Sequence, residues 1–185
     1  MNPPFPLFFG ILIFIVPAFF CSLYSLGWYL VFQKVTFPLS GKLLPPLVAL
    51  FLILVQPFLI PVIIQTNTDL IISLFIPVTV VAMANITPWP FFEGRINFAD
   101  PKIIILVCGT FTALFLIISG AAAAFGSGNI LILQGLLDLI EYFIPDTVPF
   151  RWFIIRSIAY YIFCLIAVTI LYLFMYSIEW FMDKK

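Results

Sequence analysis

The fold is decided by the stretch FPLFFGILIFIVPAFFCSLYSLGWYLVF, which runs from Phe5 to Phe32 without a charged residue. A helix that crosses the hydrocarbon core of a membrane needs about 20 predominantly apolar residues. The apolar part of a cleaved signal peptide is only about 7–15 residues long and follows a basic segment, which residues 1–4 do not provide. We therefore expect this stretch to be a retained transmembrane helix.

The composition of the whole chain agrees with this expectation. Of its 185 residues, 64% are hydrophobic and 9% are charged, whereas soluble domains are about 45–50% apolar and about 25% charged. Eight basic and eight acidic residues cancel, so the basic excess of a nucleic-acid-binding protein is absent. The chain has no histidine, which excludes histidine-ligated haem and imidazole acid–base chemistry. We expect a membrane protein surrounded by lipids, with no nucleic-acid partner.

Apolar runs repeat along the chain, separated by short polar connections. Pro57 and Pro61 interrupt the second run and predict a kink or a partial span. Asp100 and Pro101 precede the fourth run and are typical of a helix start. We predict an all-α fold, a polytopic bundle of about six transmembrane helices in a single membrane domain over residues 1–185, with one helix broken by proline and the fifth short. The runs cover residues 5–32, 47–64, 70–87, 103–124, 130–144 and 153–180.

The distribution of basic residues predicts an orientation. If all six runs cross, the segments 33–46, 88–102 and 145–156 lie on one side and carry six of the eight basic residues. Basic loops stay on the cytoplasmic or matrix side of a membrane, so we place them there, in a bacterial plasma membrane or a mitochondrial inner membrane. If the fifth run does not cross, the C-terminus changes sides. Trp89, Trp152 and other aromatic residues near run ends predict anchors at the membrane interface.

The fifth run contains the polar residues that most invite a functional interpretation. Gln134, Asp138 and Glu141 follow one another at helical spacing and share one stripe of a helix. A charge at the centre of a bilayer costs about 2.5–3.5 kcal/mol on insertion scales, so such residues usually face a protein interior, water or a cation. One interpretation is a proton or ion pathway along this stripe. The alternatives are an amphipathic interfacial helix, or a buried ion pair with Arg156 or with another subunit.

Two other segments are candidates for weaker roles. Glu93, Arg95 and Asp100 gather charges of both signs in the segment 88–102, which predicts either a site at the level of lipid headgroups or a solvated loop with local salt bridges. Gly120, Ala123 and Gly126 belong to a run of small residues that favours close packing against another helix, including one from another chain.

Single polar residues and cysteines inside the apolar runs have simpler interpretations. Gln33, Gln56 and Asn85 predict hydrogen bonds between helices. The three cysteines stand singly in apolar runs, so we expect neither a disulfide framework nor a metal site. No phosphate-binding loop, nucleophile elbow or cluster of metal ligands is present in the sequence. The chain is therefore not expected to be catalytic alone.

The middle of the chain resembles the NADH dehydrogenase subunit 1 family, a membrane subunit of respiratory complex I. The similar pieces follow the family's order over about residues 25–145. They are Gln33 with Pro38, Leu54–Phe58, Asn67–Leu70, Leu74–Val78, Ile86–Trp89, Glu93–Gly94, Ala99–Asp100, Gly135, Tyr142 and Ile144–Pro145. The sequence departs from the family at Ser25–Gly27, where the family has an acidic–basic triplet. Glu141 lies near the place of the family's membrane acid, but out of register.

This resemblance implies a subunit of an NADH:quinone oxidoreductase, with quinone as the associated cofactor and other membrane subunits as partners. We therefore expect a structural or proton- or quinone-pathway subunit of a larger, respiratory membrane complex, with no cofactor bound directly. The alternatives are a small independent transporter or channel for protons, ions or an apolar solute, and a membrane scaffold or assembly factor.

Overall fold

A computed structural model of the chain describes residues 7–34, 42–66, 69–124 and 131–184. All regular secondary structure within these residues is helical. The helices are α1 (Leu7–Lys34), α2 (Leu44–Thr66), α3 (Asp69–Ile86), α4 (Trp89–Phe92), α5 (Pro101–Ala124), α6 (Leu131–Phe143) and α7 (Arg151–Met182). Six of them coincide with the predicted apolar runs to within about three residues at either end. The all-helical class is therefore confirmed, and the short helix α4 is an addition that the hydrophobic pattern did not predict.

Three helices in the described part of the chain are long and apolar enough to cross a membrane. These segments are Leu12–Lys34 in α1, Pro101–Ala121 in α5 and Arg151–Met182 in α7. By contrast, the 13 residues of α6 extend over about 20 Å, which is shorter than the roughly 30 Å of a hydrocarbon core. Length therefore argues against a crossing by α6 alone, and the six-span bundle stays a prediction.

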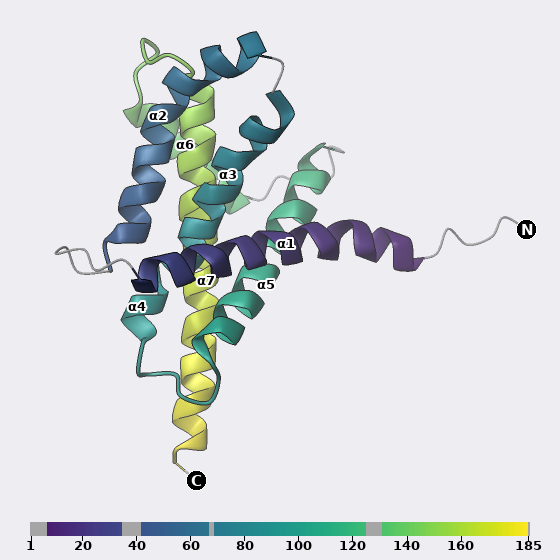
Figure 1. Ribbon diagram of the computed structural model, residues 1–185, viewed down its shortest axis with the longest axis vertical. Coiled ribbons are helices and arrows are strands. Elements are labelled where there is room, and N and C mark those ends of the chain that lie inside the picture. The colour runs from purple at the N-terminus through teal and green to yellow at the C-terminus, as the bar shows by residue number, and fades with distance from the viewer. Residues whose placement is uncertain (1–6, 35–41, 67–68, 125–130, 185) are drawn as a thin grey trace, which may run out of the picture.

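The long helices cross rather than run alongside one another (Figure 1). Helix α7 extends along the length of the molecule to the C-terminus, and α1 lies crosswise to it. Helix α1 packs mainly against α5 and also against α3, while α3 contacts α2 and α7. Transmembrane helices tilt by about 20° on average, so the crosswise α1 departs from the near-parallel packing that a simple bundle implies. Helix α2 bends in its second half, which contains Pro57 and Pro61, in agreement with the predicted kink.

Aromatic side chains fill the centre of the main core. The ring of Trp89 in α4 lies 6.4 Å from that of Tyr29 and 6.1 Å from that of Tyr172, centroid to centroid. Phe92 stacks on Tyr172 at 5.4 Å. Trp89 is only 4% exposed, so its predicted role as an interfacial anchor is wrong, because α4 turns it inward against α1 and α7. Trp152 is 54% exposed, as an interfacial anchor would be.

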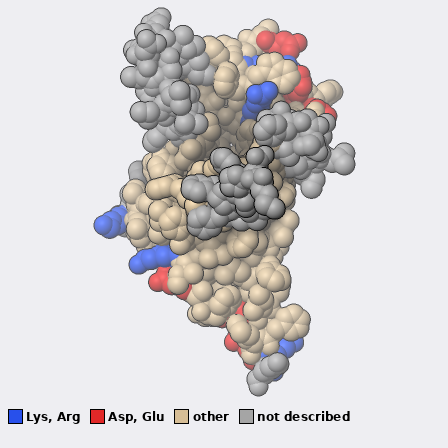
Figure 2. All heavy atoms as spheres, turned by 90° about the vertical axis from the view of Figure 1, so that its right-hand side faces the viewer, with Lys and Arg blue, Asp and Glu red and all other residues tan. Residues whose placement is uncertain are grey.

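The outer surface of the molecule is predominantly apolar. Figure 2 shows one face on which charged side chains form a few small groups, separated by wide uncharged areas. Large apolar side chains stand exposed on the long helices, among them Phe20, Phe51, Phe111 and Phe174 at 60–64% exposure. Exposed apolar area on this scale is unusual for a soluble monomer, and it is compatible with a membrane protein.

Candidate functional site

Helix α6 presents an apolar face to α7 and its polar stripe to the outside. Leu133, Leu137 and Ile140 pack with Ile155 and Ala159 of α7 in one hydrophobic cluster. This division of the helix into two faces is what the spacing of its apolar residues predicts.

The polar stripe begins with a pair of exposed side chains. Gln134 and Asp138 are both exposed, and Nε2 of Gln134 donates a hydrogen bond of 3.0 Å to Oδ1 of Asp138. The predicted stripe is thus confirmed for this pair. It does not face a protein interior within the described chain.

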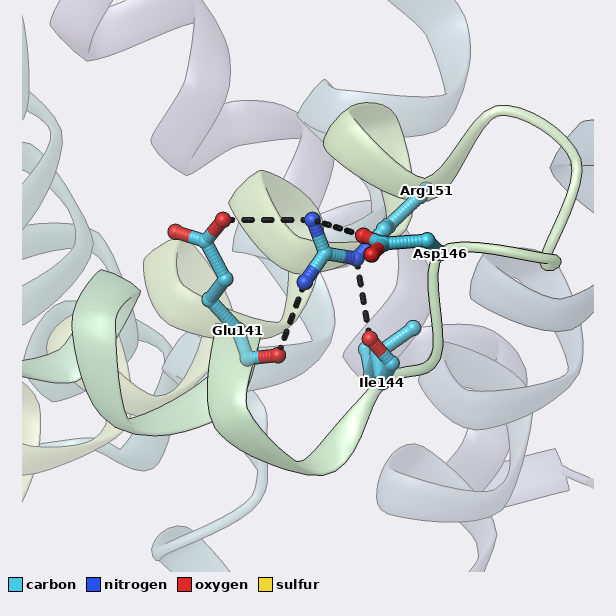
Figure 3. Close-up of polar contacts among 4 residues, drawn as sticks. All are labelled: Glu141, Ile144, Asp146 and Arg151. Carbon is cyan, nitrogen blue, oxygen red and sulfur yellow. Dashed lines mark hydrogen bonds and ion pairs between the residues drawn. The ribbon is translucent and has the colours of Figure 1, made fainter.

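Glu141 is paired with Arg151 across the turn between α6 and α7 (Figure 3). Nη1 of Arg151 lies 3.1 Å from Oε1 of Glu141 and 3.0 Å from Oδ1 of Asp146. The predicted alternative was a buried ion pair with Arg156 or with another subunit, whereas the observed pair is with Arg151 and the Glu141 side chain is 37% exposed. The connection between the helices is short, and it returns the first residue of α7 to the last turn of α6.

Arg151 also binds the backbone of that turn. Its Nε donates to the carbonyl oxygen of Ile144 at 2.8 Å, and its Nη2 donates to that of Glu141 at 3.0 Å. The last carbonyls of a helix have no partner within the helix itself. The planar guanidinium supplies several donors in fixed directions, and here it satisfies the end of α6 while holding the start of α7.

This geometry makes the turn a structural clamp more than a proton path. The carboxylate of Glu141 faces a fixed cation, and its side chain is 37% exposed while that of Arg151 is 17% exposed. A relay would place Asp138 and Glu141 in a shared enclosed cleft, whereas Asp138 is exposed on the outer face. Of the two alternatives, the exposed polar stripe is that of an amphipathic helix, whereas the ion pair is partly exposed and is made with Arg151.

The charged residues of the loop before α5 lie at the surface, and both interpretations of this loop, a site at the level of lipid headgroups and a solvated loop, stay predictions. Glu93, Arg95 and Asp100 are all exposed, and no ion pair joins them within the described loop. The local salt bridges expected there are therefore not formed. Asp100 has a local structural role, because its Oδ1 accepts a hydrogen bond of 2.8 Å from the backbone N–H of Lys102 at the start of α5. The predicted helix start is confirmed.

Sequence reasoning missed an acid that the structure buries. Glu179 is 6% exposed near the end of α7. Its two carboxylate oxygens accept hydrogen bonds from the backbone N–H groups of Asn97 at 2.9 Å and Phe98 at 3.0 Å. It therefore ties the loop before α5 to the far end of α7. An acid inside an otherwise apolar run was the signal that could have found it.

Two of the single polar residues form the hydrogen bonds between helices that were predicted for them. Gln56 of α2 donates from Nε2 to Oγ of Ser157 in α7 at 3.0 Å. Asn85 of α3 donates from Nδ2 to Oγ of Ser25 in α1 at 3.2 Å. Gln33 bonds instead to Tyr29 within α1. In an apolar interior such pairs favour one relative position of the helices.

Close packing between helices occurs at a glycine that the sequence did not single out. A Cβ built on Gly109 of α5 would lie 3.0 Å from Cβ of Ser22 in α1. Oγ of Ser22 also lies 2.9 Å from Oγ1 of Thr110. Small side chains at this point allow α1 to cross α5 closely.

The run of small residues that was predicted to pack against another helix does not form such a close contact at Gly120. A Cβ on Gly120 would meet nothing within 4 Å, so this residue packs against no other part of the described chain. The side chain of Ala123 and all of Gly126 lie outside the described residues. Contact of this run with another chain stays a prediction.

A half-open cavity of about 320 Å³ lies between α1, α3, α5 and α7. Its wall is almost entirely apolar and includes Cys21, Val81 and Ile117. Arg156 and Tyr160 of α7 also line it. Arg156 was predicted to belong to the same pathway as Asp138 and Glu141. It lines this cavity instead and is not part of the polar stripe of α6.

Comparisons of the chain with known protein families, with curated proteins and with solved structures find no match. The interpretation of these sites therefore rests on their chemistry and geometry.

Proposed function

We propose that this protein is an integral membrane subunit of a larger membrane complex. The observation that carries the proposal is the outward polar stripe of α6. Gln134 and Asp138 are exposed beside the exposed apolar side chains of Leu139, Tyr142 and Phe143. A short helix that combines both kinds of side chain on its outer face suits a contact with another subunit, because a partner can cover the apolar side chains and offer hydrogen bonds to the polar ones.

Respiratory complexes are the first candidates for the assembly. The ordered resemblance to NADH dehydrogenase subunit 1 supports membership of an NADH:quinone oxidoreductase, and with it a mitochondrial inner membrane or a bacterial plasma membrane. The basic segments 33–46, 88–102 and 145–156 then face the matrix or the cytoplasm. In such a complex the chain would have a structural role or border a proton or quinone pathway completed by neighbouring subunits.

An independent transporter receives less support from the same residues. A pathway through one chain needs polar groups that face a common interior. Glu141 is engaged by Arg151, and Asp138 is exposed, so the stripe would form a path only if a second chain covered it. The subunit hypothesis includes that case.

The test is to extract the tagged protein with a mild detergent and to separate native complexes by size. We expect the chain to migrate with a high-mass assembly that oxidises NADH with quinone as the acceptor. Migration as a small particle would contradict the subunit hypothesis, and a large assembly without this activity would contradict only the respiratory assignment.

A charge reversal on α6 tests the surface itself. Asp138→Arg should release the chain from the assembly without unfolding it, because the side chain is exposed. Asp183→Arg is the matched control, since Asp183 is an exposed acid that follows the last residue of α7, whereas α6 is connected to the first residue of α7. Equal retention of both variants would exclude the stripe of α6 as the contact.

A further inference from the structure

The cavity beside Arg156 has the chemistry of a ligand site. Small-molecule sites are mostly apolar pockets of about 300–1,000 Å³ with a small number of placed polar groups. This cavity of about 320 Å³ combines apolar side chains from α3 and α5 with the cationic Arg156 and the phenol of Tyr160. Arg156 and Tyr160 are four residues apart, so they lie on the same face of α7.

The guanidinium of Arg156 lacks a counterion in the described part of the chain. The ion pairs there involve Arg151, and Arg156 makes no other side-chain interaction with described residues. Ser157, the other hydroxyl at the wall, is engaged by Gln56. Arg156 is exposed and lines the half-open cavity, so its guanidinium is accessible to a ligand. Arginine binds carboxylate and phosphate groups through paired hydrogen bonds.

The position of Arg156 along α7 also suits an anionic headgroup. It follows the start of the helix at Arg151 by about 8 Å along the axis. The exposed Trp152 lies in the same first turns, where an aromatic residue is typical of the membrane interface. The apolar wall, formed by side chains such as Leu116 and Ile117, would then extend toward the hydrocarbon.

We propose that this cavity binds an anionic amphiphile, with its carboxylate or phosphate on Arg156 and its hydrocarbon chain against the apolar wall. The same chemistry is shared by a free fatty acid anion and by an anionic phospholipid. No acidic residue lines the cavity, so nothing in its wall repels the negative head. The inference rests on this cavity alone and does not depend on membership of a complex.

A second cavity isolates the contribution of the charge. It lies between α5 and α7, measures about 390 Å³ and is lined by side chains such as Phe115, Phe163 and Ile170, without a charged residue. Both cavities offer apolar area, but only the first offers a cation. Binding that follows the charge of the ligand therefore reports on Arg156.

The test measures binding of labelled palmitate, phosphatidylglycerol and phosphatidylcholine to the full chain in neutral detergent. We expect Arg156→Gln to weaken binding of an anionic probe by about tenfold or more, and Arg156→Lys to retain part of it. Arg95→Gln is the matched control, because Arg95 is exposed in a loop outside the cavity. Val81→Phe should fill the cavity and weaken binding while leaving the charge in place.

The outcomes separate the two sources of ligand. Binding of palmitate that depends on Arg156 identifies a free fatty acid site. Retention of phosphatidylglycerol over phosphatidylcholine that depends on Arg156, without such binding of palmitate, identifies a phospholipid site. Equal binding of both anionic probes by the wild type and Arg156→Gln would overturn the proposal. If that variant does not fold, unchanged binding by Val81→Phe would overturn it.

Discussion

Two glutamates lie at opposite ends of α7, and their carboxylates are held by different groups. At the first end, Glu141 pairs with the guanidinium of Arg151. At the other end, Glu179 accepts two hydrogen bonds from backbone N–H groups of the loop before α5. The first carboxylate is 37% exposed, whereas Glu179 is 6% exposed as a residue.

The difference leads us to expect that burial, more than charge pairing, decides how much each acid contributes to stability. Exposed ion pairs contribute about 0–1 kcal/mol, because water and salt screen them. A buried acceptor is different, since its removal leaves its donors without partners at about 1–3 kcal/mol for each unsatisfied group. We therefore expect Glu179 to hold the fold more strongly than Glu141.

The largest effect is expected for Glu179→Ala. Loss of both acceptors should lower the free energy of unfolding by about 3 kcal/mol and should speed amide hydrogen exchange at Asn97 and Phe98. Unfolding in mixed micelles with increasing SDS measures the first quantity, and mass spectrometry measures the second. Glu93→Ala is the matched control, because Glu93 is exposed. Equal stability and equal exchange in the two variants would show that the two backbone bonds contribute little.

Arg151→Gln should have the next largest effect. The variant loses the contacts of the guanidinium with two carbonyls and two carboxylates, and we expect a loss of about 2 kcal/mol. Arg151→Lys keeps the charge but not the fork of donors, so it should recover only part of the loss. Full recovery with lysine would mean that charge, and not the backbone contacts, closes the turn. The same micelle titration measures both variants.

Glu141→Gln should be milder than either change. Its side chain is partly exposed, and the amide oxygen can still accept a hydrogen bond from Arg151, so we expect a loss of less than about 1 kcal/mol. Asp146→Asn should be nearly neutral, because the Asp146 side chain is 91% exposed. A loss at Glu141 that matches the loss at Glu179 would break the contrast between the two ends of α7.

The smallest effect is expected from ionic strength, which should change the stability contribution of the ion pair at one end of α7 and leave that of the buried acid at the other end unchanged. Raising the salt concentration from about 0.01 M to 1 M shortens the screening length from about 30 Å to 3 Å. The difference in stability between the wild type and Glu141→Gln should then shrink by about 0.5 kcal/mol. The difference for Glu179→Ala should stay constant, since buried hydrogen bonds are little screened. Parallel salt series in a non-ionic detergent, with thermal unfolding as the readout, measure both differences.

The positions of the helices could be predicted from the sequence because apolar runs are local. The run from Phe5 to Phe32 became α1 (Leu7–Lys34), and the pair Asp100-Pro101 marked the start of α5 through a cap that involves neighbouring residues only. Helix α4 was missed, since one turn that contains Trp89 between prolines produces no periodic pattern.

The partners of the charged residues could not be predicted in the same way. The acid Glu141 was recognised as one that needs a partner, but the choice between Arg151 and Arg156 depends on the path of the turn after α6. Glu179 stands in an apolar run and could have been noticed, but its partners could not, because they are backbone groups more than 80 residues away in the sequence. Backbone donors carry no signature in the residue types that supply them.

The sequence by itself determined that this chain is helical and apolar, where its helices lie and which few residues carry charge, because these properties follow from composition and spacing within one segment. Only the tertiary structure decided that α1 crosses the other helices, that Arg151 closes the turn, that Glu179 holds a distant loop and that Arg156 lines an apolar cavity. The physical reason is that side-chain pairing depends on the relative placement of whole helices. That placement follows from packing at small residues such as Gly109, where a single added carbon would meet Ser22.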